Sequence, residues 1–255
     1  MPEGDTLART AAALGPLLVG KPVVAADARR PGPRMDRVVG SSITAVQAVG
    51  KHLLIRFDIG IELRTHLRLH GSWHRYRPGE SWRRPPGRMS VVLEVPGATA
   101  VCFDAPVVEL FEQRVESIHP VLAALGPNLL ADPPDIDEAV RRLRTPDHAD
   151  RAIAEALLDQ RALAGIGNEI KNEVLWQAHV WPWTPMRDVD HAAVRSLVEL
   201  AVLVLREGAA TGRRPSHVHR RAGRPCPRCG TAIAVRHKGT ELPRLTFWCP
   251  SCQAP

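Results

Sequence analysis

Residues 157–169 read LLDQRALAGIGNE, and this stretch determines the fold of the second half of the chain. An apolar helical segment is followed by a connection that contains Gly165 and Gly167, and Asn168 opens the next segment. The two glycines permit left-handed backbone angles, and Asn168 is a good N-cap residue. We therefore predict a helix, two tight turns and a second helix. The open N–H groups of the second helix could bind a phosphate; an ordinary glycine-rich connection between packed helices is the alternative.

The rest of the chain has a strand-rich part before this stretch and helical parts around it. Apolar residues at helical spacing predict a first helix over residues 5–18, with Asp5 as a candidate N-cap. Short apolar runs between Pro22 and about Phe111 predict a sandwich of strands. The expected strands are 42–49, 52–57, 61–69, 89–95 and 98–103. Residues 75–88, basic and rich in Pro and Gly, predict a loop. The expected helices are 136–143, 151–158, 168–178 and 191–207.

Four cysteines near the end of the sequence form two CxxC pairs separated by 19 residues; they are Cys226, Cys229, Cys249 and Cys252. This spacing predicts one structural Zn²⁺ ion, because four thiolates complete a tetrahedral site and leave no open position. Strand-forming residues between the pairs predict a hairpin with its turn at Lys238 and Gly239. Two disulfides are the alternative, which the lack of a signal sequence disfavours. We expect Cys102, the fifth cysteine, to be a buried strand residue.

The 255-residue chain is basic, with 34 Lys+Arg against 27 Asp+Glu and a net charge of +7. Residues 213–228 alone hold six arginines, and this basic run leads into the cysteine pairs. Arginine binds phosphate in a bidentate manner, so we expect a nucleic-acid partner rather than a merely solvated basic face. The length allows one to three domains. The sequence has no apolar stretch of 18 residues, so we expect no membrane span and an intracellular protein.

The first four residues are Met1-Pro2-Glu3-Gly4. Removal of Met1 would leave the ring nitrogen of Pro2 as a free secondary amine. An α-amino group has a pKa of about 7.7–8.0, so roughly a tenth of it is neutral and nucleophilic at pH 7. Attack on an aldehyde-type carbon gives an iminium ion that stays charged and acidifies the neighbouring C–H bond. Glu3 offers a carboxyl group for proton transfer; an ordinary terminus is the alternative.

Taken together, the order and spacing of these segments resemble the formamidopyrimidine-DNA glycosylase/endonuclease VIII family. The matching pieces are MPEG at 1–4, GKHLL at 50–54, THLRLHGSW at 65–73, LLDQRALAGIGN at 157–168, and PCPRCG and FWCPSCQ within 225–253. The resemblance implies an α+β multidomain fold with DNA bound between its two halves. Its expected parts are a catalytic β-sandwich domain with a flanking helix at 1–112, a helix–two-turn–helix DNA-binding domain at 113–222, and a zinc-ribbon finger at 223–255.

The resemblance also implies roles in bond breaking. Pro2 is expected to be the nucleophile that attacks C1′ of the damaged nucleotide and displaces the base. Glu3 is expected to be the general acid/base that assists opening of the sugar ring. Lys51 matches the family lysine, whose ammonium group would hold a phosphate and favour the neutral form of Pro2 by like-charge repulsion.

The residues expected to contact DNA are Arg68, Leu69, His70, Asn168 and Arg244. Leu69 aligns with the apolar wedge that fills the space of the extruded base, with Arg68 and His70 beside the opposite strand. A core strand position is the alternative for Leu69. Asn168 matches the phosphate-binding asparagine of the helical motif. Arg244 lies where the family's finger arginine holds the phosphate beside the lesion.

The expected function is that of a bifunctional DNA glycosylase/AP lyase that excises oxidised bases in base-excision repair by β,δ-elimination. Oxidised pyrimidines are favoured, because MPEGDT resembles endonuclease VIII, in particular an actinobacterial-type second endonuclease VIII, and residues 104–111 lack the arginine of the formamidopyrimidine branch. A purine-directed glycosylase and a non-catalytic damaged-DNA-binding protein are the alternatives. Thr6 and Ile170 depart from the usual glutamate and tyrosine.

The expected partner is damaged double-stranded DNA, with bubble or single-stranded DNA left open. We expect no membrane partner. The resemblance further implies a monomer in the bacterial cytoplasm, associated with the nucleoid.

Overall fold

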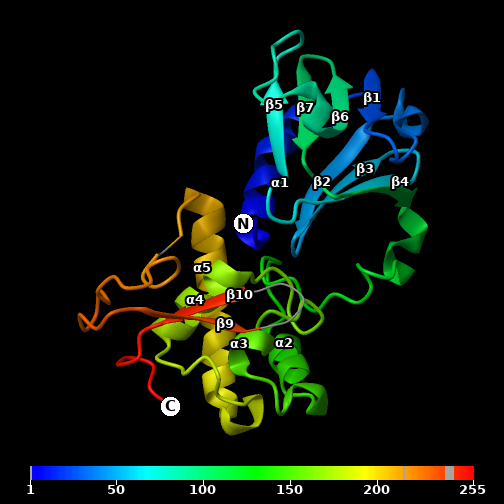
Figure 1. The fold of residues 1–255 in the computed structure, drawn as a ribbon. Helices are drawn as coiled ribbons and strands as arrows, with labels where there is room; N and C mark the ends of the chain where they lie inside the picture. The colour runs from blue at the N-terminus through cyan, green and yellow to red at the C-terminus, as the bar shows by residue number, and fades with distance from the viewer. Residues whose placement is uncertain (1, 215, 239–243) are drawn as a thin grey trace. The chain divides into compact units, whose positions relative to one another are not determined.

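The computed structural model describes residues 2–214, 216–238 and 244–255 (Figure 1). The chain divides into two compact units, unit 1 (Met1–Ala124) and unit 2 (Leu125–Pro255). Across the described residues, no helix is long and apolar enough to span a membrane. The α-helices of the expected second domain and the hairpin of the expected finger both fall in unit 2, while the two boundaries between the three expected domains stay predictions.

Unit 1 is the sandwich that the sequence predicts. Its elements are α1 (Gly4–Leu18), β1 (Ala25–Ala28), β2 (Ile43–Val49), β3 (His52–Phe57), β4 (Ile61–His66), β5 (Ser72–Tyr76), β6 (Met89–Val95), β7 (Ala98–Phe103) and β8 (Val107–Glu112). They form two four-stranded antiparallel sheets, ordered β1-β6-β7-β5 and β2-β3-β4-β8. Leu7, Leu14 and Leu18 of α1 lie in the same apolar core as Ile55 and Leu93 of the two sheets, so the helix and the inner sheet faces stabilise one another.

Several details of unit 1 differ from the prediction. The N-cap of α1 is Glu3 rather than Asp5, whose Oδ1 instead accepts a hydrogen bond from the backbone N–H of Thr6 at 2.6 Å. The strand expected at 61–69 ends at His66, because Arg68 adopts a positive φ of 45°. Strands β1, β5 and β8 were not among the expected ones. In particular, β5 occupies the first residues of the predicted loop at 75–88.

Unit 2 contains four α-helices and a hairpin among the described residues. They are α2 (Ile136–Leu143), α3 (Ile153–Ala156), α4 (Asn168–Gln177), α5 (His191–Thr211), β9 (Ala234–Lys238) and β10 (Arg244–Trp248). The side chains of Asp135 and Asp190 cap α2 and α5 by accepting backbone N–H groups at 3.0 and 2.9 Å. β9 and β10 pair antiparallel, as expected for the finger hairpin. The turn predicted to begin at Lys238 and Gly239 continues outside the described residues.

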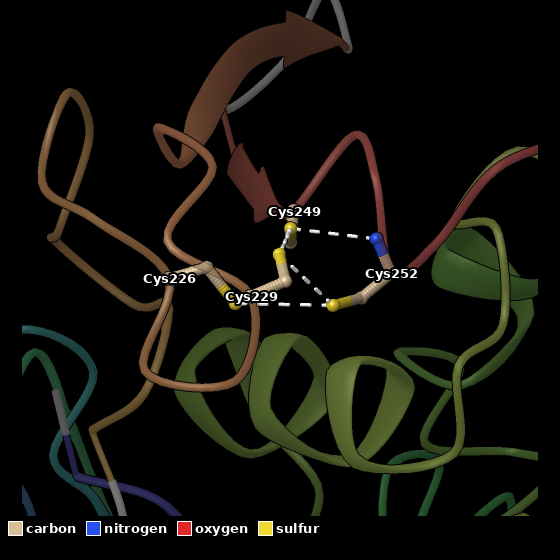
Figure 2. Close-up of side chains that lie close together, drawn as sticks. All are labelled: Cys226, Cys229, Cys249 and Cys252. Atoms are coloured by element: carbon tan, nitrogen blue, oxygen red, sulfur yellow. Dashed lines mark hydrogen bonds between the residues drawn. The ribbon is translucent and has the colours of Figure 1, made fainter.

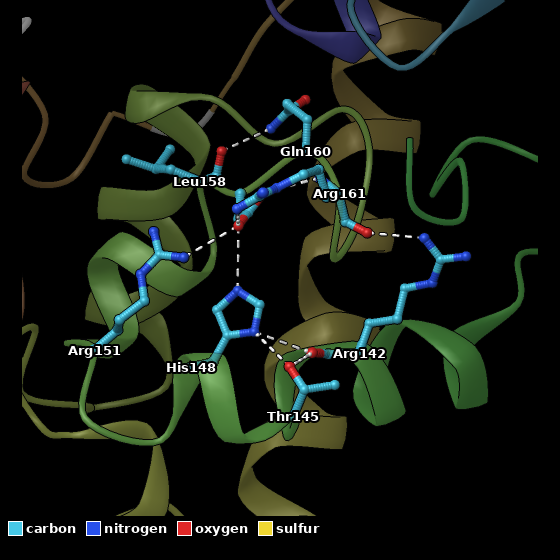
Figure 3. Close-up of polar contacts among 8 residues, drawn as sticks. Arg142, Thr145, His148, Arg151, Leu158, Gln160 and Arg161 are labelled. Carbon is cyan, nitrogen blue, oxygen red and sulfur yellow. Dashed lines mark hydrogen bonds and ion pairs between the residues drawn. The ribbon is translucent and has the colours of Figure 1, made fainter. Parts of the chain in front are cut away.

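The Asp159 carboxylate holds the connection between α3 and α4 by ion pairs. Figure 3 shows its three partners, His148, Arg151 and Arg161. The carboxylate, 8% exposed, pairs with Arg161 at 2.9 Å, Arg151 at 3.1 Å and His148 Nε2 at 3.3 Å. The hydrogen bond from Arg161 lowers the pKa of Asp159 well below its ordinary value, with partial burial opposing the shift. The carboxylate is therefore ionised at neutral pH and fixes the end of the first helix of the motif.

Gln160 shapes the rest of this connection. Its Nε2 donates to the backbone O of Leu158 at 3.1 Å and of Ile166 at 3.0 Å, and its Oε1 accepts from the N–H of Gly165 at 3.1 Å. Gly165 has a positive φ of 119°, as predicted, but Gly167 is extended at φ −118°. Gly167 is also the N-cap of α4, so the predicted N-cap role of Asn168 is wrong. The amide of Asn168 is used elsewhere.

Candidate active site and nucleic-acid interface

Pro2 and Glu3 lie immediately before α1. Glu3 is in extended conformation (φ −121°, ψ −177°), so the chain turns away from the helix axis at this residue. Its backbone O accepts from the N–H groups of Thr6 and Leu7 at 3.0 and 3.2 Å, and its side chain is fully buried. Pro2 is half-buried. A carboxyl group is thus held at the positive end of a helix, next to the residue expected to be the nucleophile.

Lys51 occupies the turn between β2 and β3. Because Val49 pairs with His52, the turn has two residues, Gly50 and Lys51. Gly50 has a positive φ of 55°, as the first residue of a type II′ hairpin turn requires. Burial is the main cause that lowers the pKa of His52 and of His66, and the charge of Lys51 is a smaller one.

A buried polar cluster beside Lys51 was missed by the sequence analysis. His52 lies opposite His66, with ring centroids 4.8 Å apart, and Arg64 lies opposite Glu109. Arg64 Nε donates to His52 Nδ1 at 3.2 Å, and the Arg64 guanidinium pairs with the Glu109 carboxylate. Burial, with the nearby charge of Arg64, lowers the pKa of His52 to about 3 and that of His66 to about 4. The two-residue spacing of Glu62, Arg64 and His66 in β4 is the signal that could have revealed this face.

The loop between β4 and β5 presents Leu69 to solvent. The backbone N–H of Gly71 donates to Leu67 O at 2.9 Å and closes the loop. A side chain at Gly71 would clash, since its Cβ would lie 2.6 Å from Leu67 O. Leu69 is 57% exposed and its neighbours Arg68 and His70 are exposed as well. The core-strand alternative for Leu69 is therefore wrong, and the Leu69 side chain is accessible at the loop tip.

A pocket of about 550 Å³ lies between α1 and the segment that leads into β5. Its lining is mixed, with polar and apolar residues: Thr6, Arg9, Thr10, Ala13, Leu14, Leu67, Gly71, Ser72, Trp73, His74, Arg75 and Arg83. Among the residues that the structure describes, no carboxylate lines this pocket. Thr6 lies in the first turn of α1, four positions after Pro2.

In unit 2, a buried polar seam joins α4 to β10. Asn168 Nδ2 donates to Leu245 O at 2.9 Å, and Lys171 Nζ donates to Asn168 Oδ1 at 3.1 Å and to Thr246 Oγ1 at 2.9 Å. Lys171 is only 1% exposed. Arg244, the first residue of β10, is exposed and directly precedes the residue that Asn168 holds. The structure therefore brings together the two residues that were expected to bind phosphate in this unit.

Glu173 on α4 anchors part of the basic run, and it too was missed. Its buried carboxylate accepts the backbone N–H groups of His217, Val218 and His219 at 2.8, 3.0 and 2.8 Å. His217 also stacks on Trp176 at 4.4 Å, and the Arg228 guanidinium lies over the Trp176 ring at 4.1 Å. The basic run is thus fastened to the same helix as the finger hairpin.

The four CxxC cysteines converge at one point in unit 2 (Figure 2). Their Sγ atoms all lie within 4.8 Å of one another, and the closer pairs are separated by 3.4 to 3.9 Å. A tetrahedral site with metal–sulfur bonds of about 2.3 Å requires sulfur separations of about 3.8 Å. The thiols are unpaired, so the disulfide alternative is wrong. Cys102 is a fully buried residue of β7, as expected, and burial raises the pKa of its thiol.

A strand sandwich, a helix–two-turn–helix motif and a four-thiolate hairpin in one chain define a class of DNA-repair protein. The N-terminal domain of formamidopyrimidine-DNA glycosylase matches residues 1–106, and the H2TH domain of formamidopyrimidine-DNA glycosylase matches residues 125–219. The chain therefore belongs to the formamidopyrimidine-DNA glycosylase/endonuclease VIII family of DNA glycosylases and AP lyases, as its motifs predict.

Similar proteins align with nearly the whole chain. The probable endonuclease 8 2 of Streptomyces coelicolor is 37% identical over 100% of this chain and 94% of its own length. The DNA-(apurinic or apyrimidinic site) lyase Nei2 of Mycolicibacterium smegmatis is 34% identical over 99% of both chains. Endonuclease 8 of Escherichia coli is 32% identical over 99% of this chain and 100% of its own length.

Solved structures of Lactococcus lactis Fpg share the fold. The complex with abasic-site DNA superposes with a TM-score of 0.85 at 20% identity, over 99% of this chain and 100% of that chain. The complex with DNA containing an oxidised pyrimidine gives a TM-score of 0.85 at 20% identity, over 100% of both chains.

The buried His52 predicts an acid-sensitive fold. The folded protein keeps this ring neutral down to pH about 3, whereas the unfolded chain binds a proton near pH 6.5. Its contribution to stability is present above pH 6.5 and is lost as the pH falls towards 3, by about 1.4 kcal/mol per pH unit. His52→Gln keeps an acceptor for Arg64 but cannot take up a proton. Between pH 6.5 and 4 it should reduce the slope of the free energy of unfolding against pH by about 1.4 kcal/mol per pH unit, the effect of one proton, as measured by urea titration.

The matched control is His191→Gln, at an exposed residue of α5. It should leave the slope of the wild type unchanged between pH 6.5 and 4. Equal slopes for His52→Gln and the wild type would contradict the assignment of a neutral, buried His52.

Proposed function

We propose that the protein is a bifunctional DNA glycosylase/AP lyase of base-excision repair, with the amine of Pro2 as its nucleophile. The observation that carries the proposal is the fully buried carboxyl group of Glu3, held beside Pro2 at the start of α1. Buried carboxyl groups are costly, and they concentrate where a reaction needs a proton donor or acceptor. The names of its relatives, endonuclease 8 and DNA-(apurinic or apyrimidinic site) lyase, support the same reaction.

The proposed reaction begins when the Pro2 nitrogen forms a bond to C1′ of the damaged nucleotide and the bond from C1′ to the base breaks. The base leaves with the electron pair and takes up a proton. Glu3 exchanges protons with the sugar while its ring opens to an iminium ion. The positive iminium acidifies the C2′–H bond, so loss of that proton expels the 3′-phosphate. A second elimination expels the 5′-phosphate and leaves phosphate at both ends of a gap.

The remaining residues of unit 1 have binding roles in this proposal. The ammonium group of Lys51 holds a phosphate, and the two-residue turn keeps it at the end of the hairpin. Leu69, 57% exposed at a closed loop tip, fills the space left by the extruded base. An apolar wedge offsets part of the few kcal/mol that base extrusion costs. Arg68 and His70, on either side of the wedge, contact the opposite strand.

In unit 2, Asn168 and Arg244 bind the phosphate backbone. The Asn168 amide nitrogen donates to Leu245 O, and this bond fixes the side chain at the start of α4, next to Arg244. The start of α4 adds the partial positive charge of a helix N-terminus. Arg244 directly precedes Leu245, which Asn168 contacts, and it is exposed at the start of β10. The basic run at 213–228, fastened by Glu173, supplies further positive charge.

Oxidised pyrimidines are the proposed substrates. The pocket beside α1 is lined by arginine, threonine and serine side chains. Such donors suit the two ring carbonyl oxygens of a uracil-type or thymine-type lesion. An oxidised guanine presents more donors, two ring N–H groups and an amino group, than a uracil-type lesion with its single ring N–H, and these donors require acceptors. Among the described residues that line the pocket there is no carboxylate, and Thr6 stands where the family resemblance implies a glutamate.

The metal of the finger is proposed to be a single structural Zn²⁺ ion. Four thiolates at tetrahedral separations suit zinc, and they leave no coordination position for substrate. Its role is to hold the ends of the β9–β10 hairpin together, and hence to hold Arg244 in place.

The nucleophile can be tested by borohydride trapping on a single-stranded oligonucleotide with an abasic site. The wild type should form a covalent adduct, because borohydride reduces the iminium to a stable amine. A variant with an uncleaved N-terminal extension should form none, and the same extension at the C-terminus should leave trapping unchanged. Glu3→Gln should slow excision of a damaged base by about 100-fold or more. Trapping of the N-terminally extended variant at the wild-type rate would contradict the role of Pro2.

The metal can be tested by elemental analysis of the purified protein. The wild type should contain one zinc ion per chain. Cys249→Ser should lose the ion and most of the affinity for DNA, because metal binding and folding of the finger are coupled. Cys102→Ser is the matched control and should retain the ion. A metal-free wild type that binds DNA with full affinity would overturn this assignment.

The substrate can be tested with a panel of duplexes that carry thymine glycol, 5-hydroxycytosine, dihydrouracil or 8-oxoguanine. Excision of the pyrimidine lesions should exceed that of 8-oxoguanine by about tenfold or more in kcat/KM, since unpaired donors of the purine are left in the pocket. Thr6→Glu should narrow this ratio. A preference for 8-oxoguanine would instead support a purine-directed enzyme of the same fold.

A further inference from the structure

Residues 77–88, which we call the strap, connect β5 to β6, and only Arg83, which lines the pocket beside α1, has a role in the function proposed so far. Trp82 packs on Phe103 with ring centroids 5.7 Å apart and on Tyr76 at 6.4 Å. The backbone N–H of Arg83 donates to the Tyr76 hydroxyl at 3.0 Å. Trp82 and Met89 join a small apolar cluster with these rings, so the strap is fixed to the sheet rather than extended into solvent.

The strap returns to the sheet at the end where the wedge loop begins. Ser72 of β5 and Met89 of β6 both pair with Phe103 of β7, so the start of β5, the start of β6 and the end of β7 lie side by side. The wedge loop, residues 67–71, runs directly into Ser72. Residues of the strap just before Met89 are therefore neighbours of the wedge loop and of Asp104, which follows β7.

Arg84 joins these neighbours. Its Nη1 donates to the backbone O of His70 at 3.3 Å and to Asp104 Oδ2 at 2.5 Å. The Arg84 side chain is 29% exposed and that of Asp104 is 18% exposed, so the pair is largely shielded from water. Pro85 follows Arg84 and disfavours helical backbone angles there. One guanidinium group thus ties the strap to the residue that follows Leu69.

Arg88 provides an internal comparison. Its Nε donates to Asp104 Oδ1 at 2.8 Å, but no contact with the wedge loop is found for it in the described residues. Hydrogen bonds from Arg88 and Arg84 lower the pKa of Asp104, which is therefore ionised at neutral pH. Two arginines consequently share one carboxylate, and Arg84 alone extends to His70 O.

We propose that Arg84 is a positioning residue for the Leu69 wedge, an inference that rests on the function proposed above. The wedge loop is otherwise closed by the Gly71 N–H on Leu67 O and by the Arg68 N–H on His66 Nδ1 at 3.3 Å. Both of these contacts lie within the loop and its own strand. Arg84 supplies a tie to a separate, rigid segment, so the loop tip keeps its orientation when Leu69 enters the base stack.

This role predicts a selective defect. Removing a lesion from a duplex requires the wedge, because the base must leave the stack. Cleaving an abasic site in a single strand requires neither base extrusion nor wedge. Arg84→Ala should therefore reduce kcat/KM for thymine glycol in a duplex by about tenfold, the effect of one lost charged hydrogen bond. Cleavage and borohydride trapping of the single-stranded abasic oligonucleotide should stay within about twofold of the wild type.

The matched control is Arg88→Ala. It removes the same charge from a residue that contacts the same carboxylate, Asp104, but not the wedge loop. Its ratio of duplex to single-strand activity should equal that of the wild type. Arg84→Lys should recover part of the loss, because its ammonium group can reach one of the two acceptors. Insertion of Leu69 into the base stack can be measured directly with a duplex that carries the fluorescent base 2-aminopurine opposite an uncleavable abasic analogue. Its fluorescence increase on binding should be smaller for Arg84→Ala than for Arg88→Ala.

The outcomes separate this proposal from the function on which it rests. An unchanged activity ratio in Arg84→Ala, or an equal loss in Arg88→Ala, would overturn the role of Arg84 and leave the reaction intact. Failure of the wild type to trap on abasic DNA would overturn the proposed reaction, and the role of Arg84 with it. Wild-type single-strand activity in Arg84→Ala also shows that this variant is folded.

Discussion

The buried seam between α4 and β10 is the constraint on which unit 2 depends. Lys171 is nearly inaccessible to water and donates to Asn168 and Thr246, while Asn168 holds the backbone of Leu245. Separating the two elements would leave an ammonium group and several amide groups without these partners, at a cost of several kcal/mol. The finger hairpin therefore behaves as part of the helical motif. Two phosphate-binding candidates far apart in sequence are fixed in one place as a result.

Unit 1 achieves comparable precision by strand register. The two-residue turn at Gly50 and Lys51 pairs Val49 with His52. The register of β3 on β4 sets His52 opposite His66, and the register of β4 on β8 sets Arg64 opposite Glu109. Because a slip of one residue would turn these polar side chains into the apolar core, the register is strongly specified. The position of Lys51 follows from that register, while the position of Glu3 follows from the packing of α1 on the same core.

The sequence was enough to predict helices and strands that are determined by their own residues. Strands 52–57, 89–95 and 98–103 and the helix at 136–143 have the predicted bounds, since apolar periodicity alone defines them. The prediction from sequence failed where contacts with residues far away in the chain determine the structure. Asn168 is of a residue type that favours the N-cap position, but its side-chain amide donates a hydrogen bond to the backbone of Leu245, 77 residues away. β5 is too polar to be recognised as a strand without its partner β7. The Glu173 anchor and the Arg84 contact likewise depend on pairs that no local pattern displays.

The candidate functional residues share one structural position, at the end of a regular element. Pro2 and Glu3 precede α1, Asn168 is the first residue of α4, and Arg244 is the first residue of β10. Lys51 and Leu69 lie in the connections that follow β2 and β4. At such positions the rigid element fixes where the side chain begins, while the adjoining backbone is free of the ladder and open to a ligand. Contacts with neighbouring residues then determine how strongly the orientation of each side chain is fixed. This explains why polar groups that are shielded from water, the buried Lys171 and Arg64 and the partly buried Arg84, lie next to the candidate residues or their neighbours.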